Sequence, residues 1–189
     1  MTVTVRDATE ADFESLTKLD LMYTVGDRYL ALERSGTEQE PTFSLRWREG
    51  TARDVLYDTL TVDGLHQTLE KHTDAFFVAT LGSAGDAAIA GYLMIVKPRF
   101  TDAAEITDVA VDRPARGSGA GRALIEAAVA WGRERNLRAL WVEPQGEAGG
   151  PIDFYLSVGF RVNGLNDRWN TNDDHENGQQ TIYMYLELR

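Results

Sequence analysis

The chain contains no cysteine, which excludes disulfide bonds, thiolate nucleophiles and cysteine-ligated zinc. Its three histidines, His66, His72 and His175, lack the spacing of a metal-binding motif, so we expect no metal site. The sequence has no run of eighteen apolar residues and no apolar segment after a basic start, so neither a transmembrane helix nor a signal peptide is indicated. We therefore expect a cytoplasmic protein.

Basic residues are also scarce: 19 Lys and Arg stand against 30 Asp and Glu, which gives a net charge of −11. Nucleic-acid binding depends on Lys and Arg, so that class of function is disfavoured, and no membrane partner is expected. A surplus of carboxylates attracts cationic substrates, although it serves solubility equally well. A length of 189 residues, 43% of them apolar, fits one α/β domain with its own core.

The most informative stretch runs from Glu105 to Trp131. β-Branched and apolar residues at 106–111 predict a strand, and the apolar positions after the loop recur at helical spacing. Between them, Gly117, Gly119 and Gly121 remove the side chains that would keep a ligand away from the backbone amides. The start of a helix adds free N–H groups and a positive dipole end. The stretch therefore predicts a phosphate-binding loop.

Spacing excludes two common nucleotide motifs. A dinucleotide loop needs Gly-x-Gly-x-x-Gly, which Arg122 interrupts, and the Gly-Lys-Ser/Thr triplet of a P-loop is absent. The pattern Arg-x-x-Gly-x-Gly, formed by Arg116, Gly119 and Gly121, resembles the pyrophosphate loop of the GNAT superfamily of acyl-CoA-dependent N-acyltransferases. The resemblance extends over roughly residues 74–163 and includes Phe-Tyr-Leu-Ser-Val-Gly-Phe at 154–160. The alternative is a glycine-rich turn that merely lets a helix pack against a strand.

This resemblance implies an α/β fold, the GNAT fold: a single domain with a mixed, mostly antiparallel central sheet, splayed at the cofactor site and flanked by helices. Residues 1–73 would then form the acceptor side, 74–163 the acyl-CoA-binding core, and 164–189 a C-terminal loop and strand. It also implies acetyl-CoA as the acyl donor, with backbone N–H groups near 109–111 meeting the thioester carbonyl. The residues expected to bind it are Val109, Ala110, Val111, Arg116, Gly117, Ser118, Gly119, Ala120, Gly121 and Arg122.

Transfer of an acyl group to an amine needs a base for the amine and an acid for the departing thiolate. Tyr155 matches the tyrosine that serves as general acid in the GNAT family, and a phenol of pKa about 10 can protonate a thiolate of pKa about 8.5. The base is left open among Glu105, Glu143 and Asp108. On a regular strand Glu105 and Asp108 point to opposite faces, so at most one faces the acceptor unless a bulge re-aims the strand. Each of the three could instead be a solvated charge or the partner of an arginine.

One position departs from the family pattern. Where many members have an asparagine that contacts the pantetheine arm, ungapped alignment places Ala148, which puts that contact in doubt. The chain's ending, a long polar loop at 170–180 followed by Ile-Tyr-Met-Tyr-Leu, loosely resembles the streptothricin acetyltransferase branch. The loop, which includes Asp173, Asp174 and His175, could be an acidic rim of the acceptor site or, as we expect, a mobile surface loop.

The favoured function is acetylation of a primary amine on a small cationic metabolite or antibiotic. A protein N-terminal or lysine acetyltransferase is the second candidate, because Leu-Trp-Val-Glu at 140–143 matches the ribosomal-protein alanine acetyltransferases. A non-catalytic acyl-CoA-binding module is the third. The oligomeric state is left open, and a homodimer is the common case in the superfamily.

The remaining segments give local predictions. We expect Tyr23 and Trp47 to lie in the core, with a pocket wall as the alternative. Thr9 is predicted to cap a helix that runs to about Leu19. The other expected elements are a strand at 2–6, an extended arm at 22–33 broken at 34–37, a β run at 43–48, a kinked helix or two short helices within 51–71, hairpin strands at 75–81 and 89–97 joined by a turn at 82–86, and strands at 137–142 and 181–188.

Overall fold

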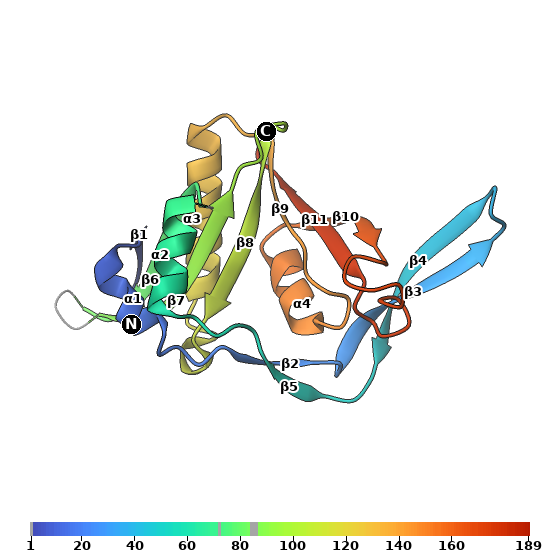
Figure 1. Cartoon of the computed structure of the whole chain (residues 1–189), viewed down its shortest axis with the longest axis horizontal. Coiled ribbons are helices and arrows are strands. Elements are labelled where there is room, and N and C mark those ends of the chain that lie inside the picture. Colours follow the sequence, from blue (N-terminus) through green and yellow to red (C-terminus); the bar gives the residue numbers. More distant parts are fainter. Residues whose placement is uncertain (1, 72, 84–86) are drawn as a thin grey trace. The chain divides into compact units, whose positions relative to one another are not determined.

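The computed structural model describes residues 2–71, 73–83 and 87–189 (Figure 1). His72 and part of the predicted turn at 82–86 lie outside the described residues. The chain forms two compact units: the first comprises Met1–Tyr23, Leu56–Trp141 and Leu186–Arg189, and the second comprises Thr24–Val55 and Val142–Tyr185. The elements, in chain order, are β1 Val3–Asp7, the 3-10 turn η1 Glu10–Asp12, α1 Phe13–Leu16, β2 Met22–Val25, β3 Arg28–Gly36, β4 Pro41–Glu49, β5 Arg53–Leu56, α2 Val62–Lys71, β6 Ala75–Leu81, β7 Ala88–Val96, β8 Ala103–Val111, η2 Arg113–Ala115, α3 Ala120–Glu134, β9 Ala139–Val142, α4 Gly149–Ser157, β10 Arg161–Asn166 and β11 Thr181–Glu187.

The first unit is built on strands in the order β1-β6-β7-β8-β9. Neighbouring strands are antiparallel except β8 and β9, which run parallel. The mixed, mostly antiparallel sheet confirms the predicted α/β architecture. Residues 90–95 of β7 are all buried, so this central strand is covered on both faces.

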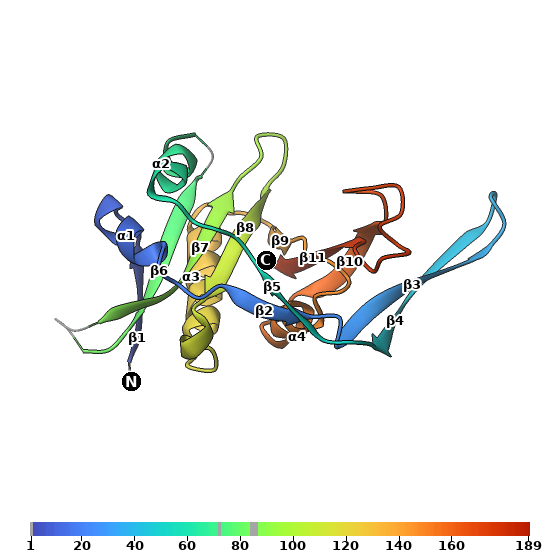
Figure 2. The ribbon, with the colours of Figure 1, turned by 60° about the horizontal axis from the view of Figure 1, so that its bottom comes forward.

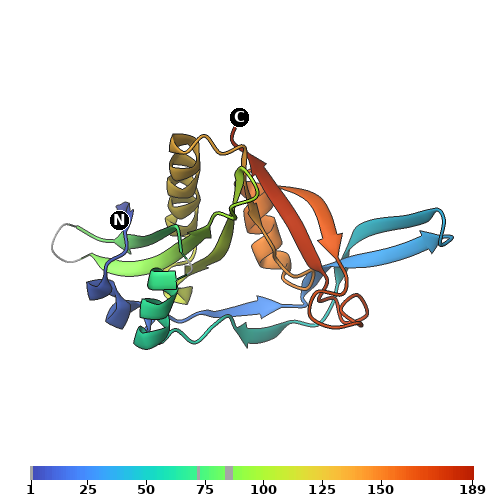
Figure 3. The same ribbon diagram turned by 45° about the horizontal axis from the view of Figure 1, so that its top comes forward.

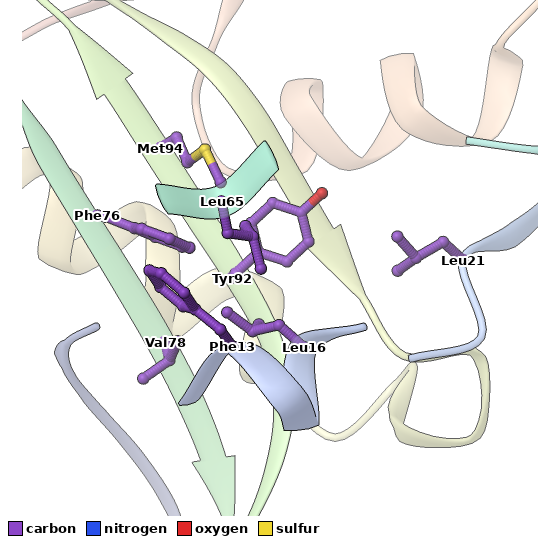
Figure 4. Packing of buried hydrophobic residues seen from close by; sticks show 8 residues of the cluster. All are labelled: Phe13, Leu16, Leu21, Leu65, Phe76, Val78, Tyr92 and Met94. Atoms are coloured by element: carbon purple, nitrogen blue, oxygen red, sulfur yellow. The ribbon is translucent and has the colours of Figure 1, made fainter. Parts of the chain in front are cut away.

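Helices cover both faces of this sheet (Figures 1 and 2). On one face, α1 and α2 pack against β6 and β7 around an aromatic cluster in which Phe13 contacts Phe76 and Phe76 contacts Tyr92 (Figure 4). On the other face lies α3, whose buried residues follow helical spacing. Among the described residues, no helix is long and apolar enough to cross a membrane.

The end of α3 is joined to the last residues of the chain. Asn136 takes a left-handed conformation with φ 55°, and Leu137 N–H donates to the carbonyl of Gly132, as at many helix ends. A Cβ at Gly132 would lie 2.7 Å from the side chain of Leu188, so glycine allows this close contact. Leu188 N–H in turn donates to the carbonyl of Arg138 at 2.9 Å.

At the N-terminus, Asp12 organises the first helical turn. Its carboxylate accepts hydrogen bonds from Thr9 N–H at 2.8 Å and from both terminal nitrogens of Arg6 at 2.7 and 2.6 Å. These bonds lower the pKa of Asp12 to about 2, the Arg6 bond having the largest effect. Thr9 is the N-cap, as predicted. The helix ends at Leu16 rather than near Leu19, because its first turn is a 3-10 turn and the chain then continues into β2.

In the second unit, β3 and β4 pair over nine residues each to form a long ribbon, light blue in Figure 3. The predicted arm at 22–33 is two strands, because Gly26 takes φ 78° between β2 and β3. The break lies at 37–40 rather than at 34–37, since β3 continues to Gly36. Tyr23, in the first unit, and Trp47 are half-buried, and neither lies among the fully buried core residues.

The segment 51–71 differs most from the prediction. Residues 53–56 form β5, which pairs with β2, and the helix begins only at Val62. Asp63 and Gly64 do not interrupt that helix but lie in its first turn, where the hydroxyl of Thr61 accepts a hydrogen bond from Gly64 N–H at 3.1 Å. Strand β10 was not predicted, since its sequence is mostly polar.

Candidate active site

The loop that follows β8 is fixed to its surroundings before it reaches the glycines. Asp112 N–H donates to the carbonyl of Ala90 at 2.8 Å, and the Asp112 carboxylate accepts from Asp20 N–H at 2.8 Å. Arg113 N–H returns a bond to the carbonyl of Asp20 at 2.9 Å. The Nε–H of Arg116 donates to the carbonyl of Val111 at 3.2 Å, which ties the predicted pyrophosphate residue to the end of β8. The first part of the loop, residues 112–116, is therefore anchored to its surroundings.

Two glycines of the loop face open space. Gly117 and Gly119 have φ angles of 79° and 92°, in the left-handed region that favours glycine. A Cβ built on either would meet no atom within 4 Å. A turn that used glycine only to let a helix pack against a strand would place strand or helix atoms there. The empty space instead fits a ligand that approaches the backbone amides.

The N-terminus of α3 opens onto the same loop. Gly119 is its N-cap and supplies no side-chain hydrogen bond, while the Ser118 hydroxyl accepts from Ala120 N–H at 3.3 Å. The first N–H groups of a helix have no partner within the helix, and its dipole favours an anion there. Gly121 and Arg122 follow in this first turn, so the predicted loop residues 116–122 lie together.

Strand β8 loses its parallel neighbour before it reaches the loop. Its pairing with β9 covers Ala103–Glu105, whereas β8 itself continues to Val111. Along residues 109–111, β8 is paired with β7 on its other side. Within the described strands, the β9-facing backbone groups of Val109–Val111 therefore have no partner in β9, which is the divergence expected of a splayed sheet.

A β-bulge in β8 changes the relation of two candidate bases. Glu105 lies opposite Val96, but Asp108 lies opposite Met94, so the register shifts by one residue between them. Val96 and Met94 are two residues apart and share a face of β7. Glu105 and Asp108 consequently lie opposite positions on one face, which a regular strand would not allow.

Asp108 has the most developed surroundings of the three carboxylates. Its Oδ1 accepts a hydrogen bond from the Tyr57 hydroxyl at 3.0 Å, and Tyr57 N–H donates to the carbonyl of Leu21. Burial raises the pKa of Asp108, and the nearby Asp58 adds to the rise. Hydrogen bonds from Tyr57 and Thr107 oppose it. A half-buried carboxylate with a raised pKa is a stronger base than an exposed one.

Two further candidates, the possible base Glu143 and the predicted acid Tyr155, lie in the second unit. Glu143 follows β9, is half-buried, and has a pKa raised by burial. Tyr155 lies on α4, and its ring packs between those of Phe154 and Phe160, each at a centroid distance of 5.5 Å. Phe160 is fully buried, so this contact fixes one side of the Tyr155 ring.

The segment around Ala148, where the sequence departs from the family pattern, is tightly packed. Ala148 is buried and caps α4, and its N–H donates to the carbonyl of Gln145 at 3.0 Å. A Cβ on Gly149 would collide with the carbonyl of Arg28, so β3 passes directly over the start of this helix. A Cβ on Gly150, by contrast, would meet nothing within 4 Å. An alanine therefore serves packing at the position where the family often has asparagine.

The polar loop at 170–180 has an internal anchor. The side chain of Asp174 accepts hydrogen bonds from Asn170 N–H at 2.7 Å and from Thr171 N–H at 2.8 Å. Burial by itself would raise the pKa of Asp174, but these bonds lower it. Asp174 is thus a structural residue of the loop rather than part of an acidic rim. In the described part of the chain, no group of His, Cys, Asp and Glu side chains could hold a metal ion.

Sequence reasoning did not identify Tyr57, Asp58 or Tyr92 as candidates. Tyr57 directly follows β5, which was expected to be helical, and it meets Asp108 across 51 residues of sequence. Tyr92 lies in an apolar run that predicts only a buried strand. In the sequence, only the adjacent tyrosine and aspartate at 57 and 58 could have indicated polar functional side chains in this segment.

Comparison with known proteins agrees with this geometry. A model of the acetyltransferase (GNAT) family matches residues 37–160. Similar solved structures include a nourseothricin acetyltransferase, with 23% identity over the whole of both chains and a TM-score of 0.75. A protein described as a streptothricin acetyltransferase of Bacillus anthracis str. Ames, in complex with acetyl coenzyme A, has 22% identity over 98% of this chain and 99% of the other, with a TM-score of 0.78.

The ribosomal-protein-S18-alanine N-acetyltransferase from Escherichia coli has 16% identity over 99% of this chain and 94% of the other, with a TM-score of 0.63. A search of curated protein sequences finds no match. The structural likenesses show the fold, and the family model covers well over half of the chain. The protein belongs to the acetyltransferase (GNAT) family.

Proposed function

We propose that this protein transfers an acetyl group from acetyl-CoA to a primary amine of a small cationic molecule such as an antibiotic. Family membership supports acetyl transfer, and the likeness to the nourseothricin and streptothricin acetyltransferases supports a small amine acceptor. The observation that carries the proposal is the glycine loop. Its two left-handed glycines leave open space in front of backbone amides at the start of α3.

The residues present fit acetyl-CoA. Backbone N–H groups of Gly117, Gly119 and Gly121 would bind the pyrophosphate, helped by the dipole of α3 and by the exposed Arg116. The β8 backbone at 109–111, which has no partner in β9, would donate to the thioester carbonyl. Bound there, acetyl-CoA supplies the acetyl group as a thioester whose sulfur leaves as a thiolate.

Asp108 is our first choice for the base. A free alkylamine of pKa about 10 is almost fully protonated at neutral pH, so one proton must leave before nitrogen can attack. Asp108 would take that proton, and burial, which raises its pKa, favours this transfer. The neutral nitrogen then forms the C–N bond as the C–S bond breaks, and the second proton that it loses as the amide forms balances the one that the acid gives to the thiolate. Glu105, which the bulge brings to the same side, and Glu143 are the alternatives.

Tyr155 would act as the acid. Its phenol is protonated at neutral pH and would give its proton to the departing thiolate. Contacts with Phe154 and Phe160 limit the motion of the ring, which helps to keep the hydroxyl oriented.

A protein acetyltransferase is the second candidate, favoured by Glu143 with its raised pKa at the end of a Leu-Trp-Val-Glu strand. A non-catalytic acyl-CoA-binding module is favoured only by Ala148, in place of asparagine.

The test is release of free thiol from acetyl-CoA with streptothricin, spermidine, an aminoglycoside, lysine and short peptides as acceptors. We expect release with a small cation and none with peptides. Release with peptides alone would establish the second candidate. Calorimetric binding of CoA without release for any acceptor would refute the proposed reaction and support the third.

A pair of variants tests the acid. Tyr155→Phe removes only the hydroxyl, and we expect kcat to fall roughly 100-fold while CoA affinity is kept. The matched control is Tyr29→Phe, which changes a half-buried tyrosine on β3. Equal kcat values for the two variants would contradict the role of Tyr155.

A further inference from the structure

Tyr92 has a buried hydroxyl that the fold does not use. The side chain is 0% exposed, and its oxygen has no hydrogen-bond partner. Phe76 packs against the ring edge to face, and in Figure 4 the hydroxyl points away from Phe13 and Phe76. A buried hydroxyl without a partner is destabilising and calls for an explanation, such as a catalytic role or a bound water, ion or ligand group.

The register of the sheet makes Tyr92 a diagonal neighbour of Asp108. Tyr92 lies opposite Ala110, and Asp108 is two residues from Ala110 on the same face of β8. Burial raises the pKa of Tyr92, and the negative charges of Asp108 and Asp58 raise it further. Asp58 belongs to the segment that follows β5, and its Oδ1 accepts a hydrogen bond from Thr59 N–H. Tyr57, which directly precedes Asp58, donates its hydroxyl to Asp108, so three oxygen-bearing side chains from separate segments lie near one another.

Aromatic rings border this group. Tyr57 donates its hydroxyl to Asp108, and its ring meets that of Tyr23 edge to face at 6.2 Å. Tyr57 is 41% exposed, so the group lies near the surface at this point. The faces of tyrosine rings attract cations.

The group carries negative charge that the protein itself does not neutralise. In the described part of the chain, neither Asp58 nor Asp108 forms an ion pair with Lys or Arg. The matching ligand has a positive charge and several N–H donors, which describes a primary alkylammonium group.

Resting on the proposed function, we propose that Tyr92, Asp58 and Asp108 form the site that binds the ammonium group of the acceptor. The Tyr92 oxygen accepts one N–H of the ammonium group, and the two carboxylates accept the others and balance its charge. Tyr57 and Tyr23 border the alkyl chain. The two carboxylates thereby select cationic primary amines over neutral acceptors of the same shape, and Tyr92 adds an acceptor for one of the ammonium N–H groups.

Binding is measured by calorimetric titration of the protein without acetyl-CoA, with streptothricin, spermidine and n-butylammonium as probes. n-Butanol serves as the neutral analogue. We expect saturable binding of at least one cation and none of n-butanol. Tyr92→Phe and Asp58→Asn should each weaken that binding by roughly 10- to 100-fold.

The controls separate binding from folding. Tyr92→Phe removes a hydroxyl without a partner, so its melting temperature should equal or exceed that of the wild type. Asp63→Asn, an exposed carboxylate on α2, changes the net charge as Asp58→Asn does and should bind the cations like the wild type.

The inference is overturned if no cation binds the wild-type protein at millimolar concentration, or if Tyr92→Phe binds as tightly as the wild type. Its failure differs from failure of the proposed function. Thiol release with unchanged cation affinity in both variants would leave the reaction standing and refute the site. Tight, Tyr92-dependent cation binding without thiol release would support the site and refute the reaction.

Discussion

Substitution of Gly119 by alanine separates a phosphate-binding loop from a simple turn. At φ 92°, an alanine costs about 1–2 kcal/mol of backbone strain. The smaller entropy of the unfolded chain returns about 0.4–1 kcal/mol, and no steric term is added because nothing lies within 4 Å of the new methyl group. The net loss of unfolding free energy is about 1 kcal/mol, or roughly 2–4 °C in melting temperature.

The effect on CoA binding should be larger. The methyl group would occupy the space in which the pyrophosphate is proposed to lie, so we expect CoA affinity to fall by at least about tenfold, or about 1.4 kcal/mol. Calorimetric titration with CoA and thermal unfolding measure the two effects on the same samples.

Gly178→Ala is the matched control. Gly178 has φ 72° in the second unit, and a Cβ there would make only an ordinary contact at 3.8 Å with the side chain of Glu147. It therefore carries similar strain without touching the loop. Equal CoA affinity for Gly119→Ala, Gly178→Ala and the wild type would refute the assignment of the loop.

Three further predictions concern stability and pH. Asp12→Asn should lose about 1–2 kcal/mol of unfolding free energy at neutral pH, because the pKa of Asp12 is lowered from 3.8 to about 2. That stability is present above pH 4 and disappears as pH falls through the folded pKa, so urea unfolding of the two proteins should converge near pH 2. Tyr57→Phe removes a hydrogen bond that lowers the pKa of Asp108, so the acid limb of the kcat/KM profile should move to higher pH; an unmoved limb would exclude Asp108 as the base. Gly149→Ala should cost at least about 2 kcal/mol by collision with β3, whereas Gly150→Ala, with open space around it, should change thermal stability little.

Local signals predicted the stretch from β8 to α3 correctly. The β-branched run, the alternating glycines and the helical recurrence are all properties of neighbouring residues, and the structure has the strand, loop and helix in that order. The hairpin strands β6 and β7 were predicted for the same reason.

Non-local contacts account for what was missed. Val55 and Leu56 fit a helical recurrence by spacing, but pairing of β5 with β2 makes their segment a strand. The bulge that brings Glu105 and Asp108 to one side depends on the partner strand β7 and leaves no mark in the sequence of β8. Likewise, the unpartnered hydroxyl of Tyr92 follows from packing that the sequence does not encode locally.

The contact between α3 and Leu188 has a consequence for biosynthesis. The first unit takes its last segment, Leu186–Arg189, from beyond the whole of the second unit. A ribosome must therefore make residues 142–185 before Leu188 can reach Gly132 and Arg138. Until then the nascent first unit has an incomplete core, so it cannot be completed before the second unit has been synthesised.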